Sequence, residues 1–122
     1  IVYKTALTVF ADYKWTRRTS RRRFRGNENC DECVQLWENT HARNANLAYK
    51  AFIQLEGLWI KAGQYLSSRA DVLPEVYVQV LSKCQDEVPS KSVETVINTV
   101  EMELGRPLPM VFDYFNPKPL AC

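Results

Sequence analysis

The longest regular pattern of apolar side chains lies in the middle of the chain. From Val34 to Leu66 such residues recur at every third or fourth position, which is the spacing of one face of an α-helix. A face of this length predicts either one long helix or two helices with a break. We expect the break at Gly57, because glycine adopts backbone conformations that end a helix. The face consists of Val34, Trp37, His41, Ala45, Ala48, Phe52, Leu55, Trp59, Ala62 and Leu66.

Helical patterns flank this region on both sides. Residues 1–15 are compatible with a helix that carries apolar side chains on nearly every side. After the central region, Pro74 fits the first turn of a helix over 74–84, because proline is tolerated where no backbone donor is needed. The apolar positions of this second helix share one side, namely Tyr77, Val80, Leu81 and Cys84.

The last helix is expected to start at a cap, either Ser90 or Ser92, and to stop at Gly105. Its apolar face is formed by Val93, Val96, Ile97, Val100 and Leu104. The tail has room for one helical turn around Met110 to Phe112, and Pro117 and Pro119 then force extended chain. No stretch alternates as a strand would, so we predict an all-α fold of about four to five helices.

Composition adds an asymmetry of charge. The 46% apolar content indicates a packed protein, and the net charge is only +2. The basic residues nevertheless crowd the amino end, where six arginines follow the apolar helix: Arg17, Arg18, Arg21, Arg22, Arg23 and Arg25.

This order of segments leaves two interpretations open. An apolar helix followed by cations is typical of a segment that lies against anionic lipid headgroups, and the six arginines are then its contact residues. Alternatively, the helix packs in a core and the arginines form a solvated turn. Nucleic acid is not an expected partner, because the chain has no recognition motif and no aromatic residues spaced for base stacking.

Cysteine chemistry is present but incomplete. We expect residues 26–33 to form a loop, and Cys30 and Cys33 in it form a CxxC pair. A structural zinc site needs a second pair, and a thioredoxin-type site needs a strand before it. We therefore expect reduced thiols and no metal site, with His41 packed on the apolar face. No nucleophile with a base and no phosphate-binding glycine loop is visible, so these residues alone do not indicate an enzyme.

The segment Lys61-Ala62-Gly63-Gln64 is unusual for a helix. Lys61, Gln64 and Ser68 are three and four residues apart and share one surface. A glycine within a helix costs about 1 kcal/mol relative to alanine. We interpret Gly63 as a position that lets another backbone or a flat ligand approach closely. The competing interpretation is a solvated helix face on which the glycine has no role.

The sequence from Trp59 to Pro74, WIKAGQYLSSRADVLP, resembles the signature of the UbiB family of atypical kinases, also called the aarF-domain or ABC1-like family. In that family a K-x-G-Q motif precedes a loop of the form [ST]-R-x-D-x-L-P. The similarity covers the chain from about Leu55 to its end, and more loosely from Ala6. The region from Thr16 to Cys33 departs from the family.

The resemblance implies a fold and a role. The KxGQ segment would be a helical extension, N-terminal to a kinase-like core, that folds over the active site. Lys61, Gly63 and Gln64 would face the nucleotide pocket, with the lysine paired to an acidic residue of the core. The family uses ATP and Mg²⁺, shows ATPase-like activity, and supports ubiquinone or other prenyl-lipid metabolism in bacteria, mitochondria and plastids.

We expect both ends of this chain to be cut from a longer sequence, since it stops before the kinase core. We divide it into 1–33, with the apolar helix, arginine segment and loop, and 34–122, the KxGQ segment leading into a truncated kinase-like domain. The partner is then the missing core in cis, and the fragment alone is expected to be inactive and to bind no cofactor.

Two further expectations concern location and an alternative function. The resemblance implies a mitochondrial or plastid protein, although the chain itself contains no targeting signal and no run of apolar residues long enough to span a membrane. The alternative function is a non-enzymatic helical module that associates with an anionic membrane surface through its basic amino end.

Overall fold

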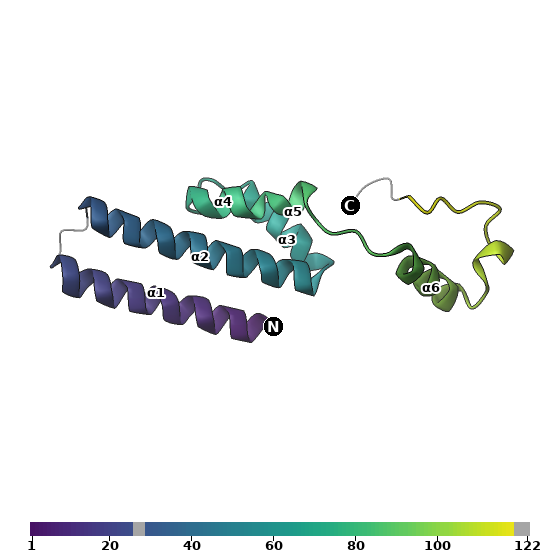
Figure 1. The fold of residues 1–122 in the computed structure, drawn as a ribbon, viewed down its shortest axis with the longest axis horizontal. Helices are drawn as coiled ribbons and strands as arrows, with labels where there is room; N and C mark the ends of the chain where they lie inside the picture. Colours follow the sequence, from purple (N-terminus) through teal and green to yellow (C-terminus); the bar gives the residue numbers. More distant parts are fainter. Residues whose placement is uncertain (26–28, 119–122) are drawn as a thin grey trace. The chain divides into compact units, whose positions relative to one another are not determined.

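The computed structural model describes residues 1–25 and 29–118, and every regular element in these ranges is helical. The predicted all-α class is therefore confirmed. The elements are α1 (Val2–Phe24), α2 (Asp31–Leu55), α3 (Leu58–Ser67), α4 (Glu75–Leu81), α5 (Lys83–Asp86), α6 (Val93–Leu104) and the short 3₁₀ helix η1 (Leu108–Met110) (Figure 1). They form two compact units, Ile1–Asp86 and Glu87–Cys122.

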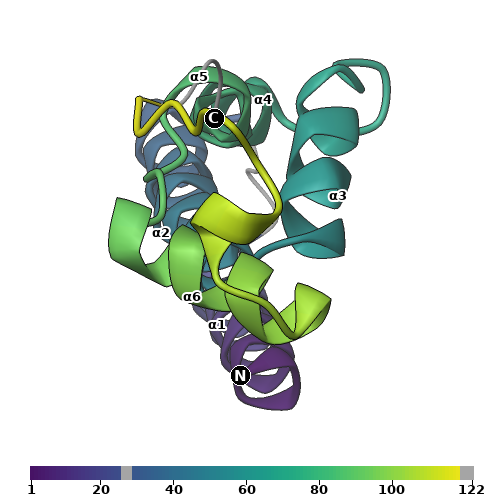
Figure 2. The ribbon, with the colours of Figure 1, turned by 90° about the vertical axis from the view of Figure 1, so that its right-hand side faces the viewer.

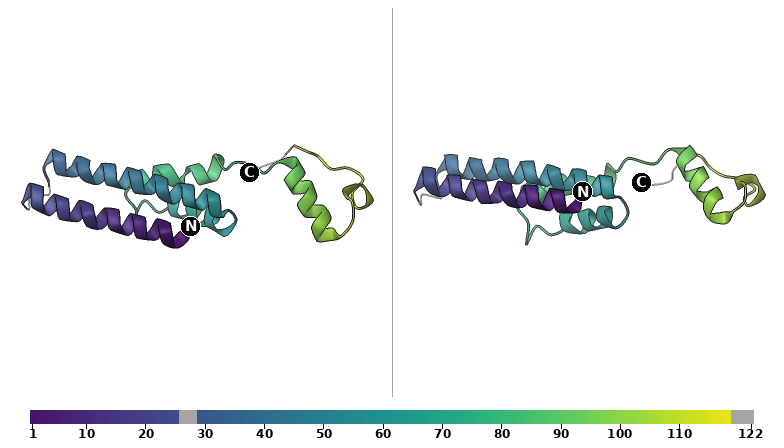
Figure 3. Two further views of the ribbon diagram at one scale, coloured as in Figure 1. Left: turned by 60° about the horizontal axis from the view of Figure 1, so that its bottom comes forward. Right: turned by 90° about the horizontal axis from the view of Figure 1, so that it is seen from below.

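The first unit is organised around α2. Helix α1 runs antiparallel to α2 along most of its length, and the views from other directions keep the two helices side by side (Figure 3). Helices α3 and α4 pack against α2 and against each other, as the view along the long helices shows (Figure 2). The helix that carries most of the central apolar face, α2, is thus the one against which α1, α3 and α4 pack.

Small polar side chains join α1 to α2. The hydroxyl groups of Thr16 and Thr40 lie 3.0 Å apart, and the Ser20 hydroxyl lies 3.2 Å from the Cys33 thiol. All four residues are buried. Buried polar groups need partners, and these pairs provide them between the two helices.

Helix α1 is longer than predicted. The helix expected over 1–15 continues to Phe24, so the arginine segment is helical and not a solvated turn. The α2-facing positions Thr16 and Ser20 extend the packed side by a further turn, and arginines in a last helical turn interact favourably with the helix dipole. The loop expected over 26–33 falls partly outside the described residues, and α2 already begins at Asp31.

The break between α2 and α3 lies where the sequence predicts it. Glu56 and Gly57 have positive φ angles of 55° and 47°, and α3 begins at the next residue. The helix expected over 74–84 is divided at Ser82 into α4 and α5. Leu81 and Cys84, on its predicted apolar side, are both buried.

The second unit contains α6 and η1. The Ser92 hydroxyl accepts a hydrogen bond from the backbone N–H of Thr95 at 3.2 Å, which identifies Ser92 as the cap. Gly105 ends α6 with a φ of 63°, as predicted. The helical turn of the tail begins at Leu108, slightly earlier than expected, and Pro119 lies outside the described residues.

None of the helices in the described ranges combines the length and the apolar content that crossing a bilayer requires.

We expect Ser92→Ala to weaken the first turn of α6 by about 1 kcal/mol, because the alanine leaves the Thr95 N–H without its acceptor. Amide exchange of Thr95, followed by NMR, should become roughly five-fold faster, since exchange reports the free energy of local opening. Ser90→Ala is the matched control and should leave it unchanged. Equal acceleration by both variants would contradict the cap assignment.

Candidate functional site

Lys61 and Gln64 lie side by side on α3. The Lys61 ammonium donates a hydrogen bond to Gln64 Oε1 at 3.2 Å, as their spacing predicts. Lys61 is exposed, and within residues 1–25 and 29–118 no carboxylate lies in ion-pair range of it. The surface therefore presents a cation whose other donors are available to a further group.

The Gln64 amide is held in place by a hydrogen bond to α5. Its Nε2 donates to the backbone carbonyl of Cys84 at 2.9 Å, so the side chain joins α3 to α5. A second link runs nearby, where Gln85 Nε2 donates to Ser67 Oγ at 2.8 Å and Ser67 Oγ donates to the Gln64 carbonyl at 2.7 Å. Because the amide hydrogens of Gln64 are directed to α5, its oxygen is held facing Lys61.

Gly63 faces inward and is buried. A Cβ placed there would lie 2.7 Å from Cys84 Sγ and 3.0 Å from the Phe52 ring. The close approach that we expected at Gly63 is therefore made by the chain itself, and it is not open to an external backbone or ligand. The assignment of Gly63 to a nucleotide-facing surface stays a prediction that rests on the resemblance alone.

An ion pair between Arg69 and Asp71 stabilises the loop after α3. The Arg69 guanidinium donates two 2.8 Å hydrogen bonds to the Asp71 carboxylate and a third to the Tyr65 hydroxyl, also at 2.8 Å. Bidentate pairs of this kind restrict geometry more than a single contact does. The hydrogen bonds from Arg69 lower the pKa of the Asp71 carboxyl. These bonds fix the start of the connection between α3 and α4 against Tyr65 of α3, the helix that carries Lys61.

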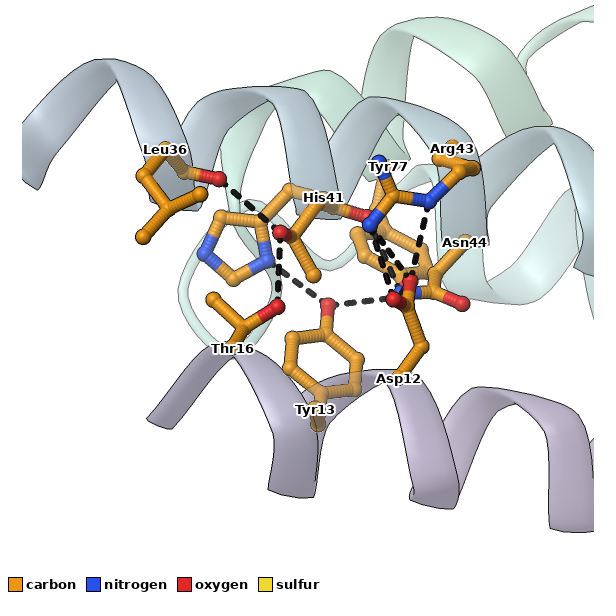
Figure 4. Close-up of polar contacts among 9 residues, drawn as sticks. Asp12, Tyr13, Thr16, Leu36, His41, Arg43, Asn44 and Tyr77 are labelled. Carbon is orange, nitrogen blue, oxygen red and sulfur yellow. Dashed lines mark hydrogen bonds and ion pairs between the residues drawn. The ribbon is translucent and has the colours of Figure 1, made fainter. Parts of the chain in front are cut away.

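A second polar cluster lies between α1, α2 and α4 (Figure 4). The Tyr13 hydroxyl lies 2.7 Å from His41 Nδ1 and 3.1 Å from the Tyr77 hydroxyl. All three groups are satisfied when Tyr77 donates to Tyr13 and Tyr13 donates to a neutral His41. Burial lowers the pKa of His41 and raises the pKa of both tyrosines, so the cluster is neutral near pH 7.

An ion pair borders this cluster. The Arg43 guanidinium contacts the Asp12 carboxylate at 2.8 Å, and Asn44 Nδ2 donates to the same carboxylate at 2.8 Å. The hydrogen bonds from Arg43 hold the pKa of Asp12 below its ordinary value. Asn44 is fully buried, and its Oδ1 has no partner among the described residues. These contacts tie α1 to α2 beside the Tyr13–His41–Tyr77 cluster.

The remaining predicted chemistry lies elsewhere in the first unit. The six arginines lie on α1 and at its end, not on the helix that carries Lys61. Cys30 precedes α2, and Cys33 is buried against Ser20. Cys30, Cys33 and Cys84 are free thiols, and no cluster of three or more metal-binding side chains occurs in the described ranges.

Sequence reasoning missed the partners that position these groups. The Tyr13 hydroxyl contacts His41, which lies 28 residues later in the sequence, and Tyr77, which lies 64 residues later. No local spacing signals such a contact. Nothing in the sequence indicated that Cys84 is the neighbour of Gly63: Cys84 lies on a face that was predicted to pack, but Gly63 was assigned to the polar face of its helix.

Comparison with known proteins identifies relatives of the chain. It is 32% identical over 91 residues, or 75% of its length, to a chloroplastic aarF domain-containing protein kinase of Arabidopsis thaliana. It is 42% identical over 69 residues to the chloroplastic protein Activity of BC1 Complex Kinase 8 of the same plant, and 34% identical over 77 residues to an ABC1 family protein of Schizosaccharomyces pombe. These matches cover 57% and 63% of the chain.

The chain spans 13%, 9% and 14% of the length of these three relatives. No protein-family model matches it, and no solved structure matches it.

We expect Gly63→Ala to lower the free energy of unfolding by about 1–3 kcal/mol, the usual range for overpacking a core. The direction is informative, because the same change in an unobstructed helix would stabilise by about 1 kcal/mol. Cys84→Ala removes the sulfur that the new methyl group meets and should relieve part of the loss. Urea unfolding of the single and double variants measures this coupling, and Cys33→Ala, the other fully buried cysteine, is the control that should add independently. Additive effects of Gly63→Ala and Cys84→Ala would contradict the packing.

We expect stability to fall as the pH drops through about 6.5, the ordinary pKa of histidine. The pKa of His41 is lowered in the folded chain, so below 6.5 the unfolded state binds the proton more readily, and the stability present at higher pH is lost. His41 is the single histidine of the sequence. His41→Gln keeps an acceptor for Tyr13 but does not titrate, so its urea midpoint should not change between pH 7.5 and about 5.5. If the urea midpoint of His41→Gln falls with pH as much as that of the unaltered chain, another group causes the loss.

Proposed function

Because the chain belongs to the UbiB/ABC1 family of aarF-domain atypical kinases, we propose that it is the helical segment that covers the nucleotide site of a kinase-like core. Lys61 and Gln64 would then lie nearest the nucleotide, with Gly63 setting the rotation of their helix. The observation that carries this proposal is the exposed Lys61 ammonium, oriented by Gln64 and without a carboxylate partner in the described residues.

The geometry around Lys61 supports such a role. An ammonium has three donors, and the bond to Gln64 uses one of them. The other donors suit a phosphate group or an acidic residue of the core, both of which form charge-assisted hydrogen bonds with an ammonium. Gln64 is bound to α5, so the helix surface is ordered before a partner arrives, which reduces the entropy lost on binding.

ATP and Mg²⁺ would be held mainly by the core. One cation and one amide form part of a pocket wall, but they supply no carboxylates for a metal ion, and Mg²⁺ prefers oxygen ligands. In the described ranges no group of acidic, histidine or cysteine side chains is placed to bind a metal. As the family resemblance implies, metal binding and phosphoryl chemistry would belong to the core.

The second unit supports the presence of a covering partner. None of the described residues of Glu87–Cys122 is buried, and large apolar side chains such as Met110 and Tyr114 are exposed. A helix with an apolar face gains most of its stability from packing. The kinase-like core, in cis, is the partner that the family suggests for this face.

Location and process follow from the relatives. Two of the relatives named above are chloroplastic, which favours a plastid for this chain. A mitochondrial location stays the alternative from the family resemblance. We place the protein in ubiquinone or related prenyl-lipid metabolism on the basis of that resemblance alone.

The first test is the coding sequence beyond Cys122. We expect it to continue into an alanine-rich loop and a kinase-like core. We also expect residues 1–122 alone to show no ATP hydrolysis above background in a phosphate-release assay, because in the family the groups that bind Mg²⁺ and phosphates belong to the core. A stop codon directly after Cys122, or turnover that Lys61→Ala abolishes in the isolated chain, would contradict the proposal.

In the full-length protein, Lys61→Ala should raise the ATP dissociation constant by about ten-fold or more, because the variant loses a hydrogen bond to a charged group. Gln64→Leu should shift it in the same direction, since it releases Lys61 without changing the charge. Lys50→Ala, an exposed lysine of α2, is the matched control. Titration with a fluorescent ATP analogue measures all three, and a control effect as large as that of Lys61→Ala would exclude a specific role.

A further inference from the structure

Helix α1 has a free side along its whole length. Thr16 and Ser20 face α2 and are buried, so the opposite side of the helix is turned to solvent. In the first half of α1 this outward side carries large apolar residues, of which Tyr3, Leu7 and Phe10 are 87%, 68% and 61% exposed. Their spacing of four and three residues places them in one row. A row of exposed apolar side chains is typical of a surface that meets a partner.

The second half of the same side is cationic. An open hollow of about 600 Å³ lies among its side chains, which are Lys14, Trp15, Arg17, Arg18, Arg21 and Arg22. In the part of the chain that the structure describes, none of these arginine side chains has a hydrogen bond or an ion pair. Their charges are thus available to an external anion, and Trp15 lies where the apolar and cationic halves meet.

No negative charge interrupts this side of the helix. Asp12 is the only acidic residue of α1, and it is paired with Arg43 of α2. The acid therefore lies on the packed side and its charge is already neutralised. The charged groups that remain on the outward side are all cationic.

We propose that the outward side of α1 binds the surface of an anionic lipid bilayer. Tyr3, Leu7 and Phe10 enter the boundary between headgroups and acyl chains, and the arginines contact lipid phosphates. Aromatic and apolar side chains with basic neighbours are characteristic of helices that lie in this interface, where Trp15 is also a preferred residue. The α1 helix does not cross the bilayer in this arrangement.

A polyanion such as nucleic acid satisfies only half of this surface. It would neutralise the arginines but leave Leu7 and Phe10 in water, whereas a bilayer accommodates both halves at once. The inference does not depend on the role of Lys61, which lies on another helix.

Vesicle sedimentation of the 122-residue chain tests the proposal. The chain should bind vesicles in which about a third of the phosphatidylcholine is replaced by phosphatidylglycerol, and should bind pure phosphatidylcholine more than about ten-fold less tightly, since each arginine near an anionic surface contributes to binding. Added salt should weaken the binding by screening. Equal binding to both vesicles, or tighter binding to a duplex oligonucleotide at the same salt, would overturn the proposal.

Two variants with the same net charge separate a local surface from a general charge effect. The first removes four charges from α1, as Arg17→Gln, Arg18→Gln, Arg21→Gln and Arg22→Gln. The control removes four exposed charges elsewhere, as Lys50→Gln, Lys83→Gln, Arg106→Gln and Lys118→Gln. The α1 variant should lose more than about ten-fold in affinity for anionic vesicles while keeping its helical circular dichroism. Comparable losses in both variants would overturn the proposal.

The apolar half has its own test. Leu7→Gln with Phe10→Gln keeps every charge and should leave binding at low salt largely intact but abolish the part that persists at high salt. The control changes two exposed apolar residues of the second unit, as Met102→Gln and Met110→Gln, and should have no effect. Unchanged high-salt binding in the α1 variant would show that Leu7 and Phe10 do not enter the bilayer.

Discussion

The close contact between Gly63 and Cys84 determines what α3 presents to solvent. With the Cys84 sulfur only 2.7 Å from the position of a Cβ, α3 can rest on α5 and α2 only if residue 63 has no side chain. This contact fixes the rotation of the helix about its axis. Lys61, two positions earlier, must then point outward, because two residues span about 200° of helical rotation. Gly63 thus fixes the orientation of the exposed Lys61, although glycine lowers the stability of a helix.

The same kind of constraint acts on α1. Its rotation is set by the Thr16–Thr40 and Ser20–Cys33 pairs and by the Asp12–Arg43 ion pair. Hydroxyls and thiols are small, so α1 can approach α2 without a row of large apolar residues between the helices. The large apolar side chains and the arginines therefore remain on the outer side. Both proposed surfaces are consequences of small-residue contacts that orient helices about α2.

The sequence predicted those features that depend on local chemistry. The break at Gly57 and the stop at Gly105 follow from backbone conformations that glycine favours, and both were located correctly. The inward position of Gly63 could not be predicted, because in a helix of ten residues several choices of buried face fit the spacing equally well. The Tyr13–His41–Tyr77 cluster joins three helices and has no signature in any one of them. The extension of α1 to Phe24 was missed because charged residues alone do not indicate whether the other side of a helix is packed.

The two proposed surfaces lie on different helices of the first unit. The outward side of α1 is turned away from α2, whereas Lys61 lies on α3, which packs against α2 and α4 (Figure 1). Helix α2 packs against both α1 and α3, and Thr40 is its buried contact with Thr16 of α1. The polar cluster around His41 ties α1, α2 and α4 together, so a displacement of α1 would also act on α4, which packs against the helix that carries Lys61.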